Sequence, residues 1–184
     1  MSSYPRIYIS GPDIFMPHWS TLCKRIRNIC DGLGFEPVFP VNPEVDLLKT
    51  ASSGLDMREK RRVSRILFMG NLVKVGSSDI VVANLAGFRG DEPDSGTVVE
   101  VSHAWANRIP VIGYRTIPHT MTEWALENGG TVDENTGNIL DDNGYLVEDF
   151  DNPVNLMVAE QCSVMIYGNI QRALVEARAF LRNH

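Results

Sequence analysis

Residues 79–85 read Asp79-Ile80-Val81-Val82-Ala83-Asn84-Leu85, a nearly unbroken apolar run with a polar residue before it. A short run of this composition predicts a strand that is covered on both faces, as in a parallel sheet. Working outward, we expect strands at residues 6–10, before the turn pair Gly11-Pro12, and at residues 109–114. Residues 35–40 predict a further strand, and its two prolines indicate an edge position.

Helical patterns separate these strands. Apolar residues at three- and four-residue spacing predict helices over residues 13–33, 57–75, 95–107 and 163–181. The alternation predicts one α/β domain over residues 1–184, with its ligand crevice beyond the carboxyl ends of the strands. In the second helix, five residues are expected to face inward: Val63, Ile66, Leu67, Gly70 and Val73.

Two segments depart from this alternation. Residues 41–57 show no regular pattern. Residues 115–152 contain the turn signals Asn135-Thr136-Gly137 and Asn143-Gly144, which predict a hairpin-like excursion. A short helix is expected after Pro153, because proline suits a first helical turn.

Composition narrows the function classes. The net charge of -6 disfavours a general nucleic-acid binder, because an acidic surface repels phosphates. Cys23, Cys30 and Cys162 are odd in number and form no CxxC pair, which indicates reduced thiols. The amino terminus lacks a signal-peptide pattern, and no apolar run reaches about 18 residues, so we expect a cytoplasmic protein without a membrane span.

Metal and cofactor motifs are not found in the sequence. The four histidines lack ligand spacing, and neither a GxGxxG nor a Walker sequence occurs. We therefore expect no metal and no cofactor. A small neutral ligand fits the composition better than a charged polymer does.

The densest polar cluster, residues 89–100, lies at the expected ligand edge. Glu100 falls in the second turn of the helix that starts near Ser95 and can look back toward the strand ends. These residues could instead serve only to cap the helix: Thr97-x-x-Glu100 matches a capping box, and Asp94 suits an N-cap. Convergence of other polar loops on the same edge favours a functional site.

Three further polar residues carry the same ambiguity. Tyr8, near the carboxyl end of the first strand, is either a core residue or a hydroxyl that orients a carboxylate. Asp79 either caps the preceding turn or takes part in catalysis. Asn155 either starts a helix or binds a ligand.

Five segments are notable in chain order: residues 8–12 with Phe15, residues 78–85, residues 88–90 with 93–97 and Glu100, residues 110–114 and residues 153–157. Taken together they resemble the nucleoside 2-deoxyribosyltransferase family over roughly residues 6–160. One difference is Ser102, which stands where family members usually carry glycine two residues after the nucleophile. Serine is small, so the close approach of the helix is expected to persist.

The resemblance implies a flavodoxin-like α/β fold: a five-stranded, mainly parallel sheet with helices on both faces. It implies a double displacement in which Glu100 is the nucleophile, Tyr8 holds it, and Asp79 and Asp94 contact the base. The resemblance also implies a homo-oligomer, because Asn155 and Met157 match residues that a neighbouring subunit lends to the site. The matching segments further predict five substrate-binding residues: Gly11, Phe15, Asn84, Phe88 and Gly96.

Such a reaction moves a 2-deoxyribosyl group from a 2′-deoxynucleoside to a free nucleobase. A carboxylate stabilises the oxocarbenium-like state and then bonds to the anomeric carbon, as in retaining glycosidases. One alternative is an N-glycosidase of 2′-deoxynucleoside 5′-monophosphates, although Asp13 at the start of the first helix would repel a phosphate. A second alternative is a non-catalytic nucleotide- or sugar-binding module.

Overall fold

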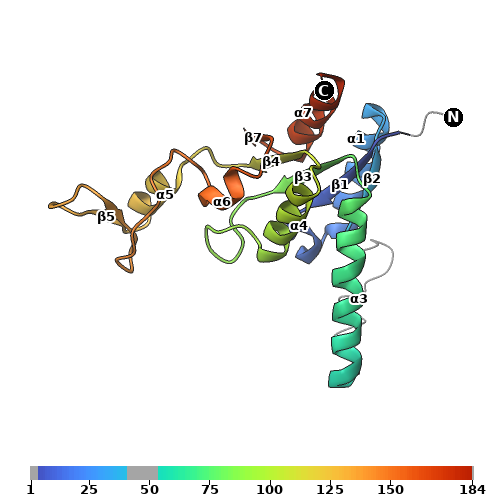
Figure 1. Ribbon diagram of the computed structural model, residues 1–184, viewed down its shortest axis with the longest axis horizontal. Coiled ribbons are helices and arrows are strands. Elements are labelled where there is room, and N and C mark those ends of the chain that lie inside the picture. Colours follow the sequence, from blue (N-terminus) through green and yellow to red (C-terminus); the bar gives the residue numbers. More distant parts are fainter. Residues whose placement is uncertain (1–3, 41–53, 184) are drawn as a thin grey trace.

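The computed structural model describes residues 4–40 and 54–183, and a five-stranded sheet forms its centre (Figure 1). The apolar run forms the middle strand, β3 (Ile80–Asn84). The strand order is β2-β1-β3-β4-β7, and every neighbouring pair is parallel, which confirms the expected α/β class. The other strands are β1 (Arg6–Ser10), β2 (Glu36–Val38), β4 (Val111–Arg115) and β7 (Val164–Tyr167).

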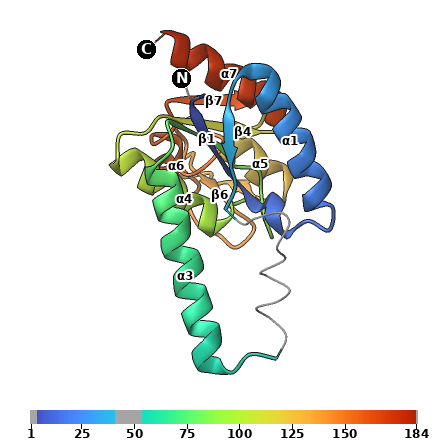
Figure 2. The same ribbon diagram turned by 90° about the vertical axis from the view of Figure 1, so that its right-hand side faces the viewer.

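Helices cover both faces of the sheet (Figure 2). One face packs against α1 (Trp19–Leu33) and α7 (Ile170–Asn183). The opposite face packs against α4 (Ser95–Ala106), α6 (Leu156–Ala159) and the last turn of α3 (Met57–Gly76). The expected edge position of the proline-containing strand is confirmed, since β2 pairs only with β1 in the described sheet.

The side chains of β1 alternate between these two layers. Ile7 and Ile9 belong to the core beneath α1 and α7, whereas Tyr8 belongs to the core beneath α4. Successive strand residues point to opposite faces, so Ser10 shares the face of Tyr8. This alternation determines which helix the two hydroxyl groups meet.

The helix expected over residues 13–33 is divided. A 3-10 helix, η1 (Pro12–Phe15), precedes α1, and Met16 between them has an extended backbone. Pro17 explains the break, because the residue before a proline is driven out of the helical region. The expected end at Gly34 is confirmed, since this residue is left-handed with φ 72°.

The single helix expected over residues 163–181 is wrong. Its first part is β7, which pairs with β4 and completes the sheet, and α7 begins after the turn at Gly168. The run Val164-Met165-Ile166-Tyr167 fits a strand as well as a helix, so periodicity alone did not separate the two.

The predicted inward face of α3 is wrong for two of its five residues, whereas Val63, Leu67 and Gly70 are half-buried. Ile66 is 60% exposed and Val73 is 67% exposed, and Val75 is the buried residue of this helix. The helix begins at a capping box formed by Asp56 and Glu59 and extends well beyond the sheet (Figure 2). Only its carboxyl-terminal end reaches the core. Of the irregular segment expected at residues 41–57, residues 41–53 lie outside the described residues.

Residues 116–152 form a projecting unit that we call the acidic arm (Figure 1). It contains α5 (Met121–Glu127), which the sequence patterns did not indicate, and the antiparallel pair β5 (Thr131–Val132) and β6 (Ile139–Leu140). The predicted turn at residues 135–137 lies between β5 and β6. Among the helices of residues 4–40 and 54–183, none combines the length and hydropathy of a membrane span.

Candidate active site

Glu100 occupies a core position on α4. The buried residues of this helix are Thr97, Glu100, Val101 and Ala104, which fall at the three- and four-residue spacing of one helix face. Glu100 is only 8% exposed. A buried carboxylate is costly unless hydrogen bonds compensate for its lost hydration, so the partners of Glu100 decide what it can do.

Two hydroxyl groups of β1 hold this carboxylate. Tyr8 Oη donates to Glu100 Oε1 at 2.7 Å, and Ser10 Oγ donates to Glu100 Oε2 at 2.5 Å. Both donors come from the same strand face, two residues apart, and both are buried. The two oxygens of Glu100 therefore have fixed positions at the carboxyl end of β1, the edge where ligands bind in open α/β sheets.

The carboxyl-terminal half of α3 adds two more polar groups. Asn71 Nδ2 donates to Glu100 Oε1 at 3.4 Å. Lys74, one turn further along, donates from Nζ to the carbonyl oxygen of Pro40 at 2.7 Å. The positive charge of Lys74 acts on Glu100 and lowers its pKa, although burial lowers the pKa of Lys74 itself.

Opposing influences act on the proton affinity of Glu100. Burial raises the pKa of this carboxyl group, and the negative charge of Asp94 raises it further. The hydrogen bonds from Ser10 and Tyr8 and the charge of Lys74 lower it, but the net direction is upward. Burial and the Glu100 charge also raise the pKa of Tyr8, which keeps that phenol protonated as a donor. The arrangement suits a carboxylate that accepts a positive charge or a covalent bond.

The side chain of Glu100 takes no part in capping α4. Asp94 is the N-cap of α4, and its Oδ2 accepts from Thr97 N at 2.9 Å and from Thr97 Oγ1 at 3.1 Å. The prediction that Asp94 is an N-cap is therefore confirmed. The alternative in which Thr97 and Glu100 form a capping box is wrong. Gly96 lies beside this cap, where a Cβ atom would come within 3.0 Å of Asp94 Oδ2.

Aromatic and amide side chains lie at the same edge of the sheet. The Phe15 and Phe88 rings stack with centroids 5.4 Å apart and planes at 19°. Asn84, at the end of β3, donates to Asp13 Oδ2 at 3.0 Å. Gly11 permits this contact, because its φ is 155° and a Cβ atom there would lie 2.8 Å from Asn84 Cβ. The loops after β1 and β3 therefore meet, as the sequence predicted.

Comparison with known proteins identifies the family. The family model for nucleoside 2-deoxyribosyltransferases matches residues 7–157. The chain belongs to the nucleoside 2-deoxyribosyltransferase family. Members of this family are enzymes that act on nucleosides and nucleobases. No relative was found among curated protein sequences.

Solved structures of similar proteins share the fold of this family member. A 2-desoxiribosyltransferase from Leishmania mexicana superposes with a TM-score of 0.67 at 23% identity, over 95% of this chain and 97% of that one. A conserved protein from Enterococcus faecalis V583 gives 0.55 at 17% identity, over 97% and 99%. A 2-deoxyribosyltransferase from Bacillus psychrosaccharolyticus gives 0.52 at 12% identity, over 94% and 90%. At such identities the likeness is one of fold.

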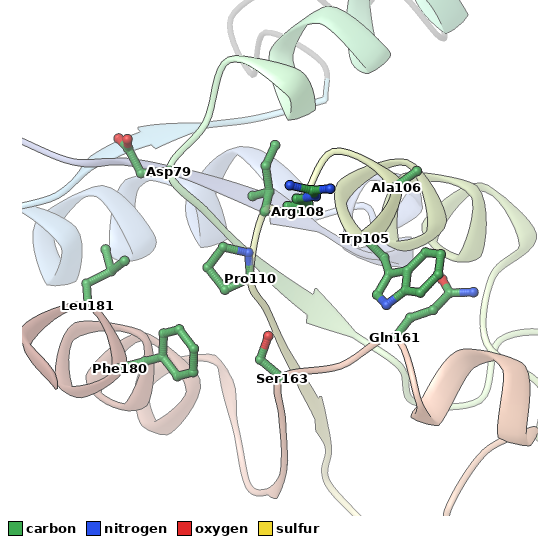
Figure 3. Close-up of a pocket in the computed structure, with 10 residues that line it drawn as sticks. Asp79, Trp105, Ala106, Arg108, Pro110, Gln161, Ser163, Phe180 and Leu181 are labelled. Atoms are coloured by element: carbon green, nitrogen blue, oxygen red, sulfur yellow. The ribbon is translucent and has the colours of Figure 1, made fainter. Parts of the chain in front are cut away.

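Asp79 does not join the cluster around Glu100, contrary to the prediction. It precedes β3 at the amino edge of the sheet, and its Oδ2 accepts from the backbone N–H of Arg6 at 2.6 Å. Asp79 precedes the first residue of β3 and Asn84 is its last residue, so the two lie at opposite edges of the sheet. Asp79 instead borders a cavity of about 710 Å³ whose lining includes Trp105, Arg108 and Phe180 (Figure 3).

Within its own chain, Asn155 makes hydrogen bonds to neighbouring groups, whereas the side chain of Met157 is exposed. Asn155 caps α6, since its Oδ1 accepts from Met157 N at 2.9 Å, while its Nδ2 donates to Glu148 Oε1 at 2.7 Å. Met157 is 65% exposed. An exposed methionine beside a polar cap is available to a neighbouring molecule.

Sequence reasoning missed three of the groups that act on Glu100: Ser10, Asn71 and Lys74. Ser10 had a usable signal, because it follows Tyr8 by two residues on a strand. Asn71 and Lys74 had none, because their helix carries many charged residues. Among the residues that the structure describes, no group of three or more His, Cys, Asp or Glu side chains is arranged to hold a metal ion.

Proposed function

We propose that this protein transfers a 2-deoxyribosyl group between nucleobases through a covalent intermediate on Glu100. The observation that carries the proposal is the buried Glu100 carboxylate, with one hydroxyl donor on each oxygen, at the carboxyl edge of a parallel sheet. A carboxylate fixed in this way is aligned for attack without having to shed an ordered water shell.

The reaction has two balanced halves. A Glu100 oxygen bonds to the anomeric carbon while the glycosidic C–N bond breaks; the electron pair of that C–N bond leaves with the base, which takes up a proton from solvent relayed by Asp94. A nitrogen of the second base then bonds to the same carbon and gives up its proton to solvent by the same route, while the bond to Glu100 breaks and its electron pair restores the carboxylate. The raised pKa of Glu100 reflects a carboxylate whose charge is poorly hydrated and therefore well placed to stabilise an oxocarbenium-like state.

Asp94 is the acidic group we assign to the departing base. Its negative charge adds to the upward shift that burial causes in the pKa of Glu100, which supports placing Asp94 near the reacting carboxylate. The stacked pair of Phe15 and Phe88, with Phe15 47% exposed, offers an aromatic surface for the heterocycle. Gly11, Gly96 and Asn84 shape the same edge of the sheet.

A homo-oligomer is part of the proposal. Asn155 and Met157 are assigned to the site of a neighbouring subunit, where the amide binds the sugar hydroxyls. The exposure of Met157 supports this assignment. The competing hydrogen bond from Asn155 to Glu148 would be exchanged for one to substrate.

The second candidate is hydrolysis of 2′-deoxynucleoside 5′-monophosphates. Asp13 argues against it, because this carboxylate lies in η1, beside Gly11 and Asn84, where a phosphate would meet a negative charge. The assay incubates deoxyinosine or its monophosphate with and without free adenine and follows products by chromatography. We expect deoxyadenosine from the nucleoside, whereas exclusive release of base from the monophosphate would establish the hydrolase instead.

The covalent step has a direct test. Glu100→Ala should abolish transfer while leaving the circular dichroism spectrum close to wild type and the unfolding transition cooperative. Mass spectrometry of the enzyme trapped with a 2-fluorinated deoxynucleoside should show the sugar on the peptide that contains Glu100. A label on another residue would overturn the assignment, and substrate binding without turnover would support a non-catalytic module.

A further inference from the structure

The hydrogen bonds to Glu100 are unequally divided between its two carboxylate oxygens. Oε1 accepts from Tyr8 Oη at 2.7 Å and from Asn71 Nδ2 at 3.4 Å. Among the side-chain hydrogen bonds of the described residues, Oε2 accepts only from Ser10 Oγ, at 2.5 Å. Each oxygen of a carboxylate offers about two lone-pair sites. Oε1 therefore uses both of its sites within the protein, whereas Oε2 keeps one site free.

The two hydroxyl donors start from different depths in the sheet. Ser10 is the last residue of β1 and borders the loop that begins at Gly11, whereas Tyr8 lies two residues, or about 6.5 Å, further from that end of the strand. Ligands bind beyond the carboxyl ends of the strands in such sheets. The donor to Oε2 is therefore the one that lies nearer to the expected crevice.

We infer that Oε2 is the oxygen of Glu100 that bonds to the anomeric carbon and that Ser10 is its positioning residue, an inference that rests on the proposed function. The free lone pair of Oε2 forms the bond to carbon, while the electron pair of the C–N bond leaves with the base, which takes up a proton. Oε1 becomes the carbonyl oxygen of the resulting ester. In the second half of the reaction, the electron pair of the Oε2–carbon bond returns to the carboxylate.

The three donors are affected differently once the ester has formed. An ester carbonyl oxygen remains a hydrogen-bond acceptor, so Tyr8 and Asn71 keep their partner. The alkyl oxygen of an ester is a poor acceptor, so Ser10 loses most of its hydrogen bond when Oε2 carries the sugar. Ser10 is 1% exposed, and a buried donor that loses its acceptor is unfavourable. Ser10 therefore stabilises the free carboxylate relative to the ester, which keeps the enzyme from accumulating in the covalent form.

Ser10→Ala should consequently shift the equilibrium toward the glycosylated enzyme. The expected rise in the ratio of ester to free enzyme is about 10- to 150-fold, the factor that corresponds to one hydrogen bond to a charged group. Tyr8→Phe should raise the same ratio by less than about tenfold, because the acceptor of Tyr8 changes from charged to neutral and is not lost. A serine that only supported the fold would leave this ratio unchanged.

A single-turnover experiment measures the ratio. The enzyme is mixed in excess with deoxyinosine and without an acceptor base, and chromatography of quenched samples gives released hypoxanthine relative to intact deoxyinosine at the first plateau. Ser20→Ala is the matched control, since this serine is exposed on α1, on the other face of the sheet from α4, and its ratio should stay within about twofold of wild type.

Infrared spectroscopy of the enzyme trapped with a 2-fluorinated deoxynucleoside identifies the carbonyl oxygen of the ester. Hydrogen-bond donors lower the stretching frequency of a carbonyl group, so Tyr8→Phe should move the ester band to higher wavenumber. Ser10→Ala should leave that band in place.

Three results would overturn the assignment of Oε2 while leaving the proposed function intact. They are a Ser10→Ala ratio within twofold of wild type, a larger rise for Tyr8→Phe than for Ser10→Ala, and an ester band that responds to Ser10→Ala and not to Tyr8→Phe. A wild-type enzyme that releases no base in the single-turnover experiment would instead overturn the proposed function, and the assignment with it.

Discussion

Tyr8→Phe removes a single oxygen atom from the contact that fixes Glu100. That oxygen lies 2.7 Å from Glu100 Oε1, and the ring around it is fully buried. Phenylalanine fills the same volume, so the strand and its core are expected to stay in place. The variant therefore isolates one hydrogen bond to a charged group.

The size of the effect follows from that hydrogen bond. A bond to a charged partner contributes about 1.5–3 kcal/mol. Since about 1.4 kcal/mol corresponds to a factor of ten, kcat/KM for deoxyribosyl transfer should fall about 10- to 150-fold. The Tyr8 hydroxyl also lowers the pKa of Glu100, so its loss raises that pKa and moves the acidic limb of the kcat/KM profile to higher pH.

The assay follows base exchange by chromatography between pH 4.5 and 8.5. Ser10→Ala, which removes the partner of the other oxygen, should shift the limb in the same direction. Tyr4→Phe is the control, because it removes an exposed phenol and should leave kcat/KM within about twofold of wild type. If Tyr8→Phe also stays within twofold and keeps the wild-type pH limb, Tyr8 does not hold a reacting carboxylate and the reasoning fails.

The remaining predictions concern stability and the placement of the two aspartates. The folded chain raises the pKa of Glu100 above its ordinary value of 4.5, so the carboxyl group favours folding below that pH and the contribution is lost as the pH rises through the raised pKa. Glu100→Gln should therefore be more resistant to urea than wild type at pH 8 and equal to it at pH 4, and equal midpoints at both would contradict the burial argument. Asp94→Ala removes the N-cap bonds to Thr97 and should cost about 1 kcal/mol in unfolding free energy, a fall in Tm of about 2–4 °C by calorimetry. Asp79→Ala, at the opposite edge of the sheet, should leave kcat/KM within about twofold of wild type, and a loss above tenfold would show that Asp79 reaches the substrate after all.

Sequence patterns predicted where helices and strands lie in the chain better than they predicted which elements pack together. The strand at residues 6–10 and the start of the helix at Ser95 are where the patterns put them, because apolar runs and caps are local signals. Two of the five inward-facing residues expected on α3 were mispredicted because exposure depends on what lies beside a helix, and most of this one extends past the sheet. β7 was missed for a similar reason: only pairing with β4 distinguishes its four residues from a helix.

The candidate site divides in the same way. The sequence singled out Glu100 because it belongs to the polar cluster at the expected ligand edge and matches the nucleophile of the family. Asp79 was misplaced because it is adjacent in the sequence to a strand whose far end, rather than its near end, faces the site. Residues before and after β3 lie at opposite edges of the sheet, because the whole length of the strand separates them.

The sequence by itself determined the parallel α/β order, since that order is written in patterns a few residues long, and its resemblance to the family singled out Glu100. Only the tertiary structure decided that Ser10, Asn71 and Lys74 join Tyr8 around that carboxylate. Tyr8, Ser10, Asn71 and Lys74 come from a strand and a helix that are distant in the chain. Their convergence depends on the twist and pairing of the whole sheet, and no local pattern encodes that geometry.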